Sequence, residues 1–351
     1  MRRPVSVAYI IDPRLPGGTS SAVAQELAAI ADIAQVKVHA LESQMFRGRN
    51  VAPQLARRLD DLRLELVWDS GTVSADIVIL HNPSFLKFQH ELGLRIFARH
   101  LVVVTHENFL RPGRHEGFGV LRCLDQIDRS SLALRKSIAP VSSHNRSTVR
   151  DWLSLHRLPG NWAVLDRDWF NVCDFPRRAP ATAISDRRGR HSRPGLEKFP
   201  GLGDMDLCFP KHAEANVILG ADLFLALGTQ RPHWLMFPFQ GIDLERYFEM
   251  FDFMVYFTSP MWRESFGRVL AEAVAAGKVV ISDAETAATF GGAVIQGTPA
   301  TVDSIIQRFI DQPRLYRDHV LAAQGKLDRF SAAAFREHFL EILSPMTGAM
   351  A

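Results

Sequence analysis

Cysteine is scarce in this chain of 351 residues, and its scarcity argues against two kinds of site. Cys123, Cys173 and Cys208 lie far apart and form no Cys-x-x-Cys spacing, which disfavours both a zinc site and a disulfide framework. Long apolar runs are missing too, because no uncharged stretch approaches the ~20 residues that a membrane-spanning helix needs. We therefore expect a cytoplasmic protein, for which peripheral contact with the inner face of the membrane stays open.

A strong net charge is also lacking. The 41 Lys and Arg residues nearly balance the 38 Asp and Glu residues, which leaves a net charge of +3. This charge is too small to argue for a nucleic-acid partner. A pI of about 8.9 is compatible with phosphate ligands or an anionic membrane surface, and solubility explains it equally well.

The chain does carry a regular alternation of predicted strands and helices. Its length allows two domains, and its 47% of hydrophobic residues is usual for a soluble globular protein. In the first half, strands are expected at residues 5–11, 36–41, 76–81, 101–106 and 138–142, and helices from residue 21 and at 51–66, 120–137 and 143–154. This order predicts a doubly wound parallel sheet.

The most informative stretch covers residues 251–281. An aromatic and apolar strand at 251–257 is followed by a loop, then by apolar residues at helical spacing over 269–274, and then by a second buried strand at 278–281. Gly277 suits the left-handed residue that ends a helix. The crossover predicts two parallel strands whose carboxyl edges bind a ligand.

Two glutamates flank the turn in this stretch. Glu264 lies in the loop after the first strand, Ser265, Phe266 and Gly267 place backbone amides at the helix start, and Glu272 follows on the helix. Amides at a helix start favour phosphate, and carboxylates accept hydrogen bonds from hydroxyls. A nucleotide sugar has both kinds of group. The alternative is two surface glutamates eight positions apart.

These residues resemble the signature of the retaining GT-B glycosyltransferases of family 4. The signature reads Glu264-Ser-Phe-Gly-Arg-Val-Leu-Ala-Glu272, followed by Ala275-Ala-Gly277. The resemblance implies an α/β protein of two Rossmann-like doubly wound domains that face one another across a cleft. It also implies transfer of a sugar from a nucleoside diphosphate to an acceptor hydroxyl with retention of configuration. Glu264 and its neighbouring amides would hold the donor sugar, and Glu272 the ribose.

The resemblance extends to a basic segment and an aromatic one. Family members carry Gly-Arg and then a lysine, whose cations neutralise the leaving diphosphate. Here Arg190 follows a glycine, Arg193 has the usual separation from Lys198, and either arginine fits the role. We expect this segment to form a basic loop. Pro238 and Phe239 match the loop that faces the nucleobase, although core packing is the better default explanation for them.

In the first domain the resemblance points to a histidine and a glycine pair. His106 ends a predicted strand, as does a family histidine near the reacting sugar, so we expect it to face Glu264 across the cleft. A histidine that only caps a loop is the alternative. His81 is expected to be structural or to lie near the acceptor. Gly17 and Gly18 match a loop that faces the donor phosphates or the acceptor.

The organisation that follows has three parts. Residues 1–165 form an acceptor-side domain, residues 166–335 a donor domain, and residues 336–351 a helix that packs back on the first domain. Asp204-Met-Asp206 is expected to be a turn rather than a metal-binding motif, so we expect neither a metal nor another cofactor. The partners are then a nucleotide sugar and a glycan, lipid-linked or small-molecule acceptor.

Two rival functions remain. One is a catalytically silent GT-B protein that binds a sugar nucleotide or glycan as a scaffold or subunit. The other is a dinucleotide oxidoreductase, which predicts Gly-x-Gly-x-x-Gly after a strand, and residues 16–20 lack that spacing.

Overall fold

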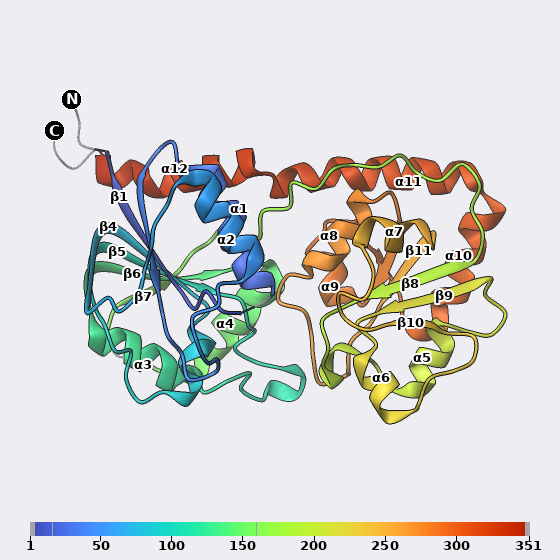
Figure 1. Cartoon of the computed structure of the whole chain (residues 1–351), viewed down its shortest axis with the longest axis horizontal. Coiled ribbons are helices and arrows are strands. Elements are labelled where there is room, and N and C mark those ends of the chain that lie inside the picture. Colours follow the sequence, from blue (N-terminus) through green and yellow to red (C-terminus); the bar gives the residue numbers. More distant parts are fainter. Residues whose placement is uncertain (1–3, 16, 159, 348–351) are drawn as a thin grey trace. The chain divides into compact units, whose positions relative to one another are not determined.

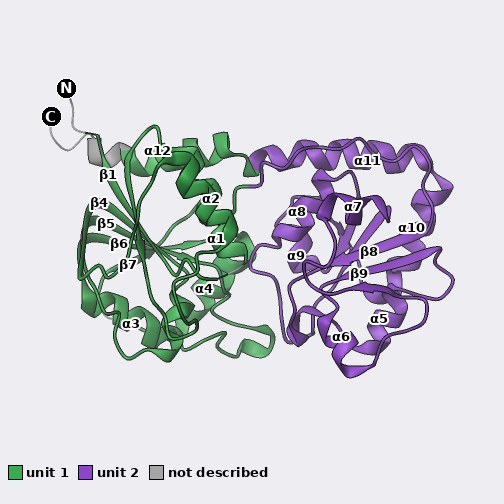
Figure 2. Cartoon of the chain, viewed as in Figure 1, with its two compact units in different colours: residues 1–172, 330–351 green, residues 173–329 purple. Residues whose placement is uncertain are grey.

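The structure is a computed structural model that describes residues 4–15, 17–158 and 160–347. The chain divides into two compact units (Figure 2). Unit 1 comprises Met1–Val172 and Phe330–Ala351, and unit 2 comprises Cys173–Arg329. From the sequence, the two boundaries were expected at 165/166 and 335/336.

The described residues of unit 1 form a seven-stranded parallel sheet in the order β3-β2-β1-β4-β5-β6-β7. Its strands are β1 (Ser6–Ile11), β2 (Gln35–Ala40), β3 (Leu66–Val67), β4 (Thr72–His81), β5 (Arg95–Thr105), β6 (Ser131–Pro140) and β7 (Trp162–Val164). The order reverses between β1 and β4, which is the switch point where such sheets bind ligands.

Helices cover both faces of this sheet (Figure 1). One face carries α1 (Gly18–Ile30), α2 (Pro53–Leu62) and α12 (Ala332–Thr347), and the other carries α3 (Val120–Ser130) and α4 (Ser143–Leu155). The 3-10 turns are η1 (Pro83–Phe88) and η2 (Pro112–Arg114). Arg336 of α12 donates to Asp32, just after α1, at 2.7 Å, so the last helix is part of unit 1.

Two expectations for unit 1 were wrong. Residues 131–137 belong to β6 rather than to a helix, because they pair along β5 and place Leu132 and Leu134 on one exposed face. Pairing with a long neighbouring strand overrides local helical preference here. The helix expected over 51–66 ends at Leu62, because Arg63 adopts a left-handed φ of 53°, and Leu66 belongs to β3.

The described residues of unit 2 form a six-stranded parallel sheet in the order β10-β9-β8-β11-β12-β13. Its strands are β8 (Arg187–His191), β9 (Ala215–Leu219), β10 (Leu235–Phe237), β11 (Phe253–Tyr256), β12 (Val279–Ser282) and β13 (Ile295–Gln296). The switch point lies between β8 and β11. Together the two parallel sheets confirm the predicted fold class of two doubly wound α/β units.

Helices again cover both faces (Figure 1). They are α5 (Leu202–Cys208), α6 (Asp222–Leu227), α7 (Leu244–Glu249), α8 (Arg268–Ala275), α9 (Ala284–Ala288), α10 (Val302–Asp311) and α11 (Pro313–Lys326), with 3-10 turns η3 (Leu196–Lys198), η4 (Pro299–Thr301) and η5 (Leu327–Phe330). Asp204 and Asp206 lie in α5, so the turn expected there was wrong. Asp206 pairs with Arg231 at 2.7 Å.

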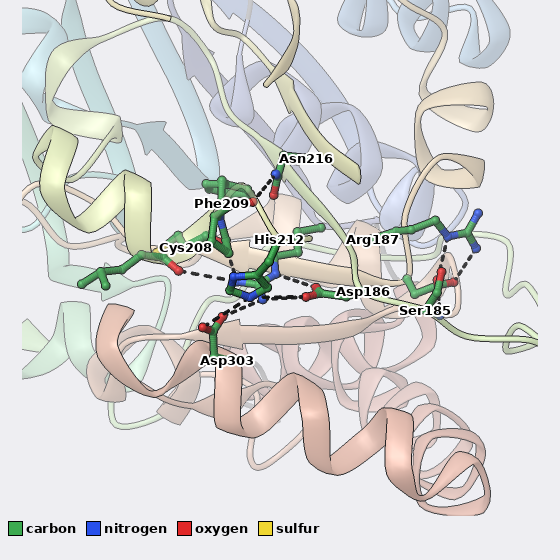
Figure 3. A network of polar contacts seen from close by, with 12 residues as sticks. Ser185, Asp186, Arg187, Cys208, Phe209, His212, Asn216 and Asp303 are labelled. Carbon is green, nitrogen blue, oxygen red and sulfur yellow. Dashed lines mark hydrogen bonds and ion pairs between the residues drawn. The ribbon is translucent and has the colours of Figure 1, made fainter. Parts of the chain in front are cut away.

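The central strand β8 is unusually polar, and Figure 3 shows the contacts that hold its first half. Arg188 is buried and donates to Asp186 and to Asp303, and the neighbouring Arg187 pairs with the buried Asp252 at 2.9 Å. A Cβ at Gly189 would collide with the ring of Phe251, so only glycine fits at this position. Arg187 and Arg188 therefore both have acidic partners, which lets the first half of β8 form from basic residues. Residues 189–191, which were expected to be part of a loop, continue this strand.

Gly220, directly after β9, shows how closely the strand ends pack in unit 2. Its φ is +85°, and a Cβ there would collide with the backbone carbonyl of Ser192. We expect Gly220→Ala to destabilise unit 2 by about 2–4 kcal/mol, because strain and collision add. Gly228, with φ +64° and open space around it, is the matched control, and Gly228→Ala should cost only about 1–2 kcal/mol. Equal losses in denaturant unfolding would refute the collision.

No helix in the described ranges is long and apolar enough to cross a membrane.

Candidate functional site

A lysine, a glutamate and a tyrosine lie close together at the switch point of unit 2, at the edge of the sheet where the strands end. Lys198, at the end of η3, donates to Glu264 Oε1 at 2.6 Å, and the hydroxyl of Tyr256 donates to the same oxygen at 2.6 Å. Lys198 and Glu264 expose only 10% and 13% of their side chains. Although burial disfavours the carboxylate, the Lys198 cation and the two hydrogen bonds hold the pKa of Glu264 below its ordinary value.

Arg190 is wholly buried beneath this pair. Its guanidinium lies 4.5 Å from the ring centroids of both Phe199 and Tyr256, and it donates to the backbone carbonyl of Lys198. Burial lowers the pKa of Arg190 from its ordinary value. The arginine thus fixes the segment that carries Lys198.

Arg193 is the more accessible of the two candidate arginines. Half of its side chain is exposed, and it pairs with Glu197 at 2.8 Å. Its charge also contributes to lowering the pKa of Glu264, so the cation stands near that carboxylate. An exposed pair of this kind is weak and opens readily for another anion.

Glu272 lies on α8 between two basic side chains. Arg268, one turn earlier, places Nε 3.4 Å from Glu272 Oε1, and His191 Nδ1 lies 3.9 Å from Oε2. His191 is the last residue of β8, and burial lowers the pKa of this histidine. The carboxylate is therefore held at the ligand-binding edge and is partly exposed.

The turn into α8 carries the remaining residues of the signature. Phe266 is buried, and its ring packs edge-on against Phe290, with centroids 5.6 Å apart. Gly267 has a left-handed φ of 88°, and a Cβ there would lie 3.2 Å from Leu270, so glycine is favoured on both counts. Ser265 precedes them and is partly exposed. The packed turn fixes where α8 begins, with the positive end of its dipole at the site.

Pro238 and Phe239 follow β10 at the same edge of the sheet. Pro238 is exposed, and Phe239 is partly exposed. The side chain of Asp222 accepts from the Phe239 amide at 2.8 Å, which holds this loop in place. Neither residue belongs to the buried core.

In unit 1 the edge of the sheet carries His106, directly after β5. Its Nε2 lies 3.0 Å from Nδ1 of the wholly buried His81 at the end of β4. Burial, and then the charge of His81, hold the pKa of His106 well below its ordinary value. His106 is partly exposed, so one edge of a neutral imidazole is available to a ligand.

The glycine pair forms the start of α1. Gly17 is extended, with φ −166°, and Gly18 is the first residue of the helix. A Cβ at Gly18 would meet nothing within 4 Å. The fold itself therefore does not require glycine at position 18.

Sequence reasoning missed Tyr256, His191 and Glu26, a residue of α1 whose Oε2 lies 3.3 Å from Nε2 of His81. The first two end strands at the switch point of unit 2, and their positions at strand ends were the available signal. Glu26 lies within a helix, and only its burial marks it. Among the described residues no cluster of three His, Cys, Asp or Glu side chains could hold a metal ion.

The fold is shared with known glycosyltransferase structures, although the sequences differ. No protein-family model matches the chain, and no curated protein sequence matches it. Alr3699/HepE of Anabaena, in complex with UDP and glucose, aligns with a TM-score of 0.66 at 15% identity, over 97% of this chain and 100% of that one. A Rickettsia africae glycosyltransferase aligns at 0.60 and 14% identity, over 99% and 100%. An alpha-glucosyltransferase bound to UDP and DNA aligns at 0.57 and 12% identity, over 97% and 99%. The chain thus has the GT-B fold.

Proposed function

We propose that this protein is a glycosyltransferase that moves a sugar from a nucleoside diphosphate to an acceptor hydroxyl with retention of configuration. The observation that carries the proposal is the Lys198–Glu264 pair at the switch point of unit 2, with Glu272 on the following helix. A cation for diphosphate and carboxylates for hydroxyls suit one ligand, a nucleotide sugar. The shared fold with UDP-bound structures supports the same ligand class.

Unit 2 holds the donor in this proposal. Lys198 and Arg193 neutralise the diphosphate, aided by the positive end of the α8 dipole at Ser265, Phe266 and Gly267. Glu272 accepts hydrogen bonds from the ribose, and Glu264 from the donor sugar. Pro238 and Phe239 contact the nucleobase.

Arg190 has a different role from the other two basic residues. Because its guanidinium lies between two rings and holds the Lys198 carbonyl, we assign it to positioning the lysine rather than to binding phosphate. Arg193, with half of its side chain exposed, is then the arginine that contacts the diphosphate.

The chemistry needs stabilisation of the charge that develops on the leaving diphosphate. Lys198 and Arg193 supply it without a metal ion, because cations placed where negative charge develops stabilise the transition state. His106 of unit 1 contacts the transferred sugar, and Gly17 and Gly18 leave room for a substrate at the start of α1. The acceptor is a glycan, a lipid-linked glycan or a small molecule.

The experiment that tests this proposal is a turnover assay with purified protein. UDP-, GDP- and ADP-sugars are supplied in turn with EDTA present, and release of the nucleoside diphosphate is followed. We expect slow hydrolysis of one donor that survives the chelator. Nucleotide binding without any turnover would favour a silent scaffold protein, and a strict requirement for added metal would contradict the assignment of Lys198 and Arg193.

Glu272 offers a separate prediction about binding. Glu272→Ala should weaken affinity for the nucleoside diphosphate by about 1–3 kcal/mol, because hydrogen bonds to the ribose are lost. Titration calorimetry measures this directly. Glu285→Ala, an exposed glutamate on α9, is the control and should bind normally. Unchanged affinity in Glu272→Ala would remove this residue from the site.

A further inference from the structure

One face of the unit 1 sheet is exposed at the amino-terminal ends of β5 and β6. Phe97 of β5 exposes 44% of its surface, and Leu132 and Leu134 of β6 expose 71% and 82%. Phe97 is the register partner of Leu132, so these two side chains project next to one another. Ile96 and Ala133, which alternate with the exposed residues, lie in the buried core or pack against it on the opposite face. Phe97, Leu132 and Leu134 thus form an apolar patch.

The neighbouring strand β4 adds uncharged polar residues to the same face. Ser74 is the register partner of Phe97, Thr72 lies two positions earlier, and both are exposed. Asp76, farther along β4, accepts hydrogen bonds from the amide and the hydroxyl of Ser6 at 2.9 and 2.7 Å, so its carboxylate is engaged at β1. Neutral side chains therefore occupy the strand positions beside the apolar patch.

Three arginines of β5 and β6 accompany the apolar patch. Arg95 and Arg135 are exposed, and Arg99 is partly exposed. Arg95 donates to a backbone carbonyl in the last turn of α3 at 3.2 Å, and within the described ranges none of the three arginines pairs with a carboxylate. Lys136 differs from them, because it pairs with Asp128 at 2.7 Å. In a chain whose net charge is only +3, three unpaired cations on two adjacent strands make this surface locally basic.

The combination of apolar side chains and unpaired cations favours a membrane over other occupants of this face. A second copy of the chain would bring the same arginines against one another, and like charges repel across an interface. A nucleic acid would engage the arginines through its phosphates but would leave the leucines in water. At an anionic bilayer, the apolar side chains enter the boundary between headgroups and acyl chains while the arginines meet lipid phosphates.

We propose that the apolar patch and its three arginines form a docking surface for an anionic membrane. His106 follows the other end of β5, nine residues after Phe97, which corresponds to about 30 Å along a strand. Docking therefore leaves the carboxyl edge of the sheet free. The proposal is independent of the proposed function, because it concerns where the protein binds and not what it transfers.

The test is co-sedimentation of the full-length protein with lipid vesicles. We expect binding to phosphatidylcholine vesicles that contain about one third phosphatidylglycerol, weak binding to pure phosphatidylcholine, and loss of binding at high salt. Leu132→Thr/Leu134→Thr should weaken binding at least about tenfold, because less apolar surface enters the bilayer. Threonine favours strands, so this variant should fold. Arg95→Gln/Arg135→Gln should also weaken binding at least about tenfold, because two cations leave the surface.

Two control variants remove the same groups elsewhere on the surface. Leu155→Thr/Leu227→Thr changes leucines that expose 60% and 62% of their surface at the ends of α4 and α6. Arg314→Gln/Arg317→Gln changes two exposed arginines of α11. Both controls should bind the anionic vesicles as the wild type does.

The outcomes separate this proposal from the proposed function, since nucleotide affinity and turnover should be unchanged in the variants of the docking surface. Equal binding to neutral and anionic vesicles, or undiminished binding of these variants, would overturn the proposal. A dimer in light scattering that the leucine variant dissociates would assign the face to a second copy and also overturn it. Binding to polyglutamate in place of vesicles would overturn it in favour of an acidic protein partner. The arginine variant decides the matter even if the leucine variant does not fold.

Discussion

Replacing His106 by alanine is expected to lower turnover by about 10²–10⁴-fold, the usual contribution of a positioned acid, base or donor group. Nucleotide affinity should be unchanged, because the proposed ribose and diphosphate contacts all belong to unit 2. The loss therefore falls on the chemical step. Steady-state kinetics on the donor, combined with calorimetry on the nucleoside diphosphate, measure the two quantities separately.

The control for this variant is His90→Ala, since His90 is an exposed histidine of the same unit. It should retain both turnover and affinity. If His106→Ala weakens nucleotide binding and turnover equally, His106 stabilises the edge of the unit 1 sheet and does not act on the sugar.

The second large effect is expected at Lys198. Lys198→Ala leaves Glu264 mostly buried without its cation, so unit 2 should lose about 3–5 kcal/mol of stability. Turnover should also fall about 10²–10³-fold, because the leaving diphosphate loses a preorganised charge. Thermal or denaturant unfolding measures the loss of stability, and a turnover assay with the donor measures the loss of activity.

A double variant distinguishes stability from chemistry at this pair. Lys198→Ala/Glu264→Gln removes both charges of the pair, and the amide oxygen introduced by Glu264→Gln still accepts from the Tyr256 hydroxyl. Stability should return to within about 1–2 kcal/mol of the wild type, whereas turnover should remain low. Recovery of turnover together with stability would make the pair structural.

Local sequence patterns were enough to predict the elements of the segment that carries Glu264 and Glu272. Apolar runs and Gly277 predicted the strand, helix and strand that the structure contains as β11, α8 and β12. The position of Glu264 at the carboxyl edge of the sheet followed from the crossover rule, because parallel strands bring their carboxyl ends to one edge.

What the sequence could not predict depends on contacts between distant residues. Arg190 was expected in a loop, and its stacking between Phe199 and Tyr256 depends on the neighbouring strand β11. A buried Glu26 is likewise invisible in a helical pattern, since its partner His81 lies 55 positions later. Charge burial of this kind is decided by tertiary pairing rather than by local propensity.

The most direct test of the central claim is a crystal structure of the protein with its nucleoside diphosphate. The account predicts the diphosphate within hydrogen-bond distance of Lys198 and Arg193, close to the start of α8, and the ribose hydroxyls on Glu272. Arg190 should remain between its two rings without touching phosphate. Nucleotide bound away from the carboxyl edge of β8 and β11, or held by groups other than Lys198 and Glu272, would contradict the account.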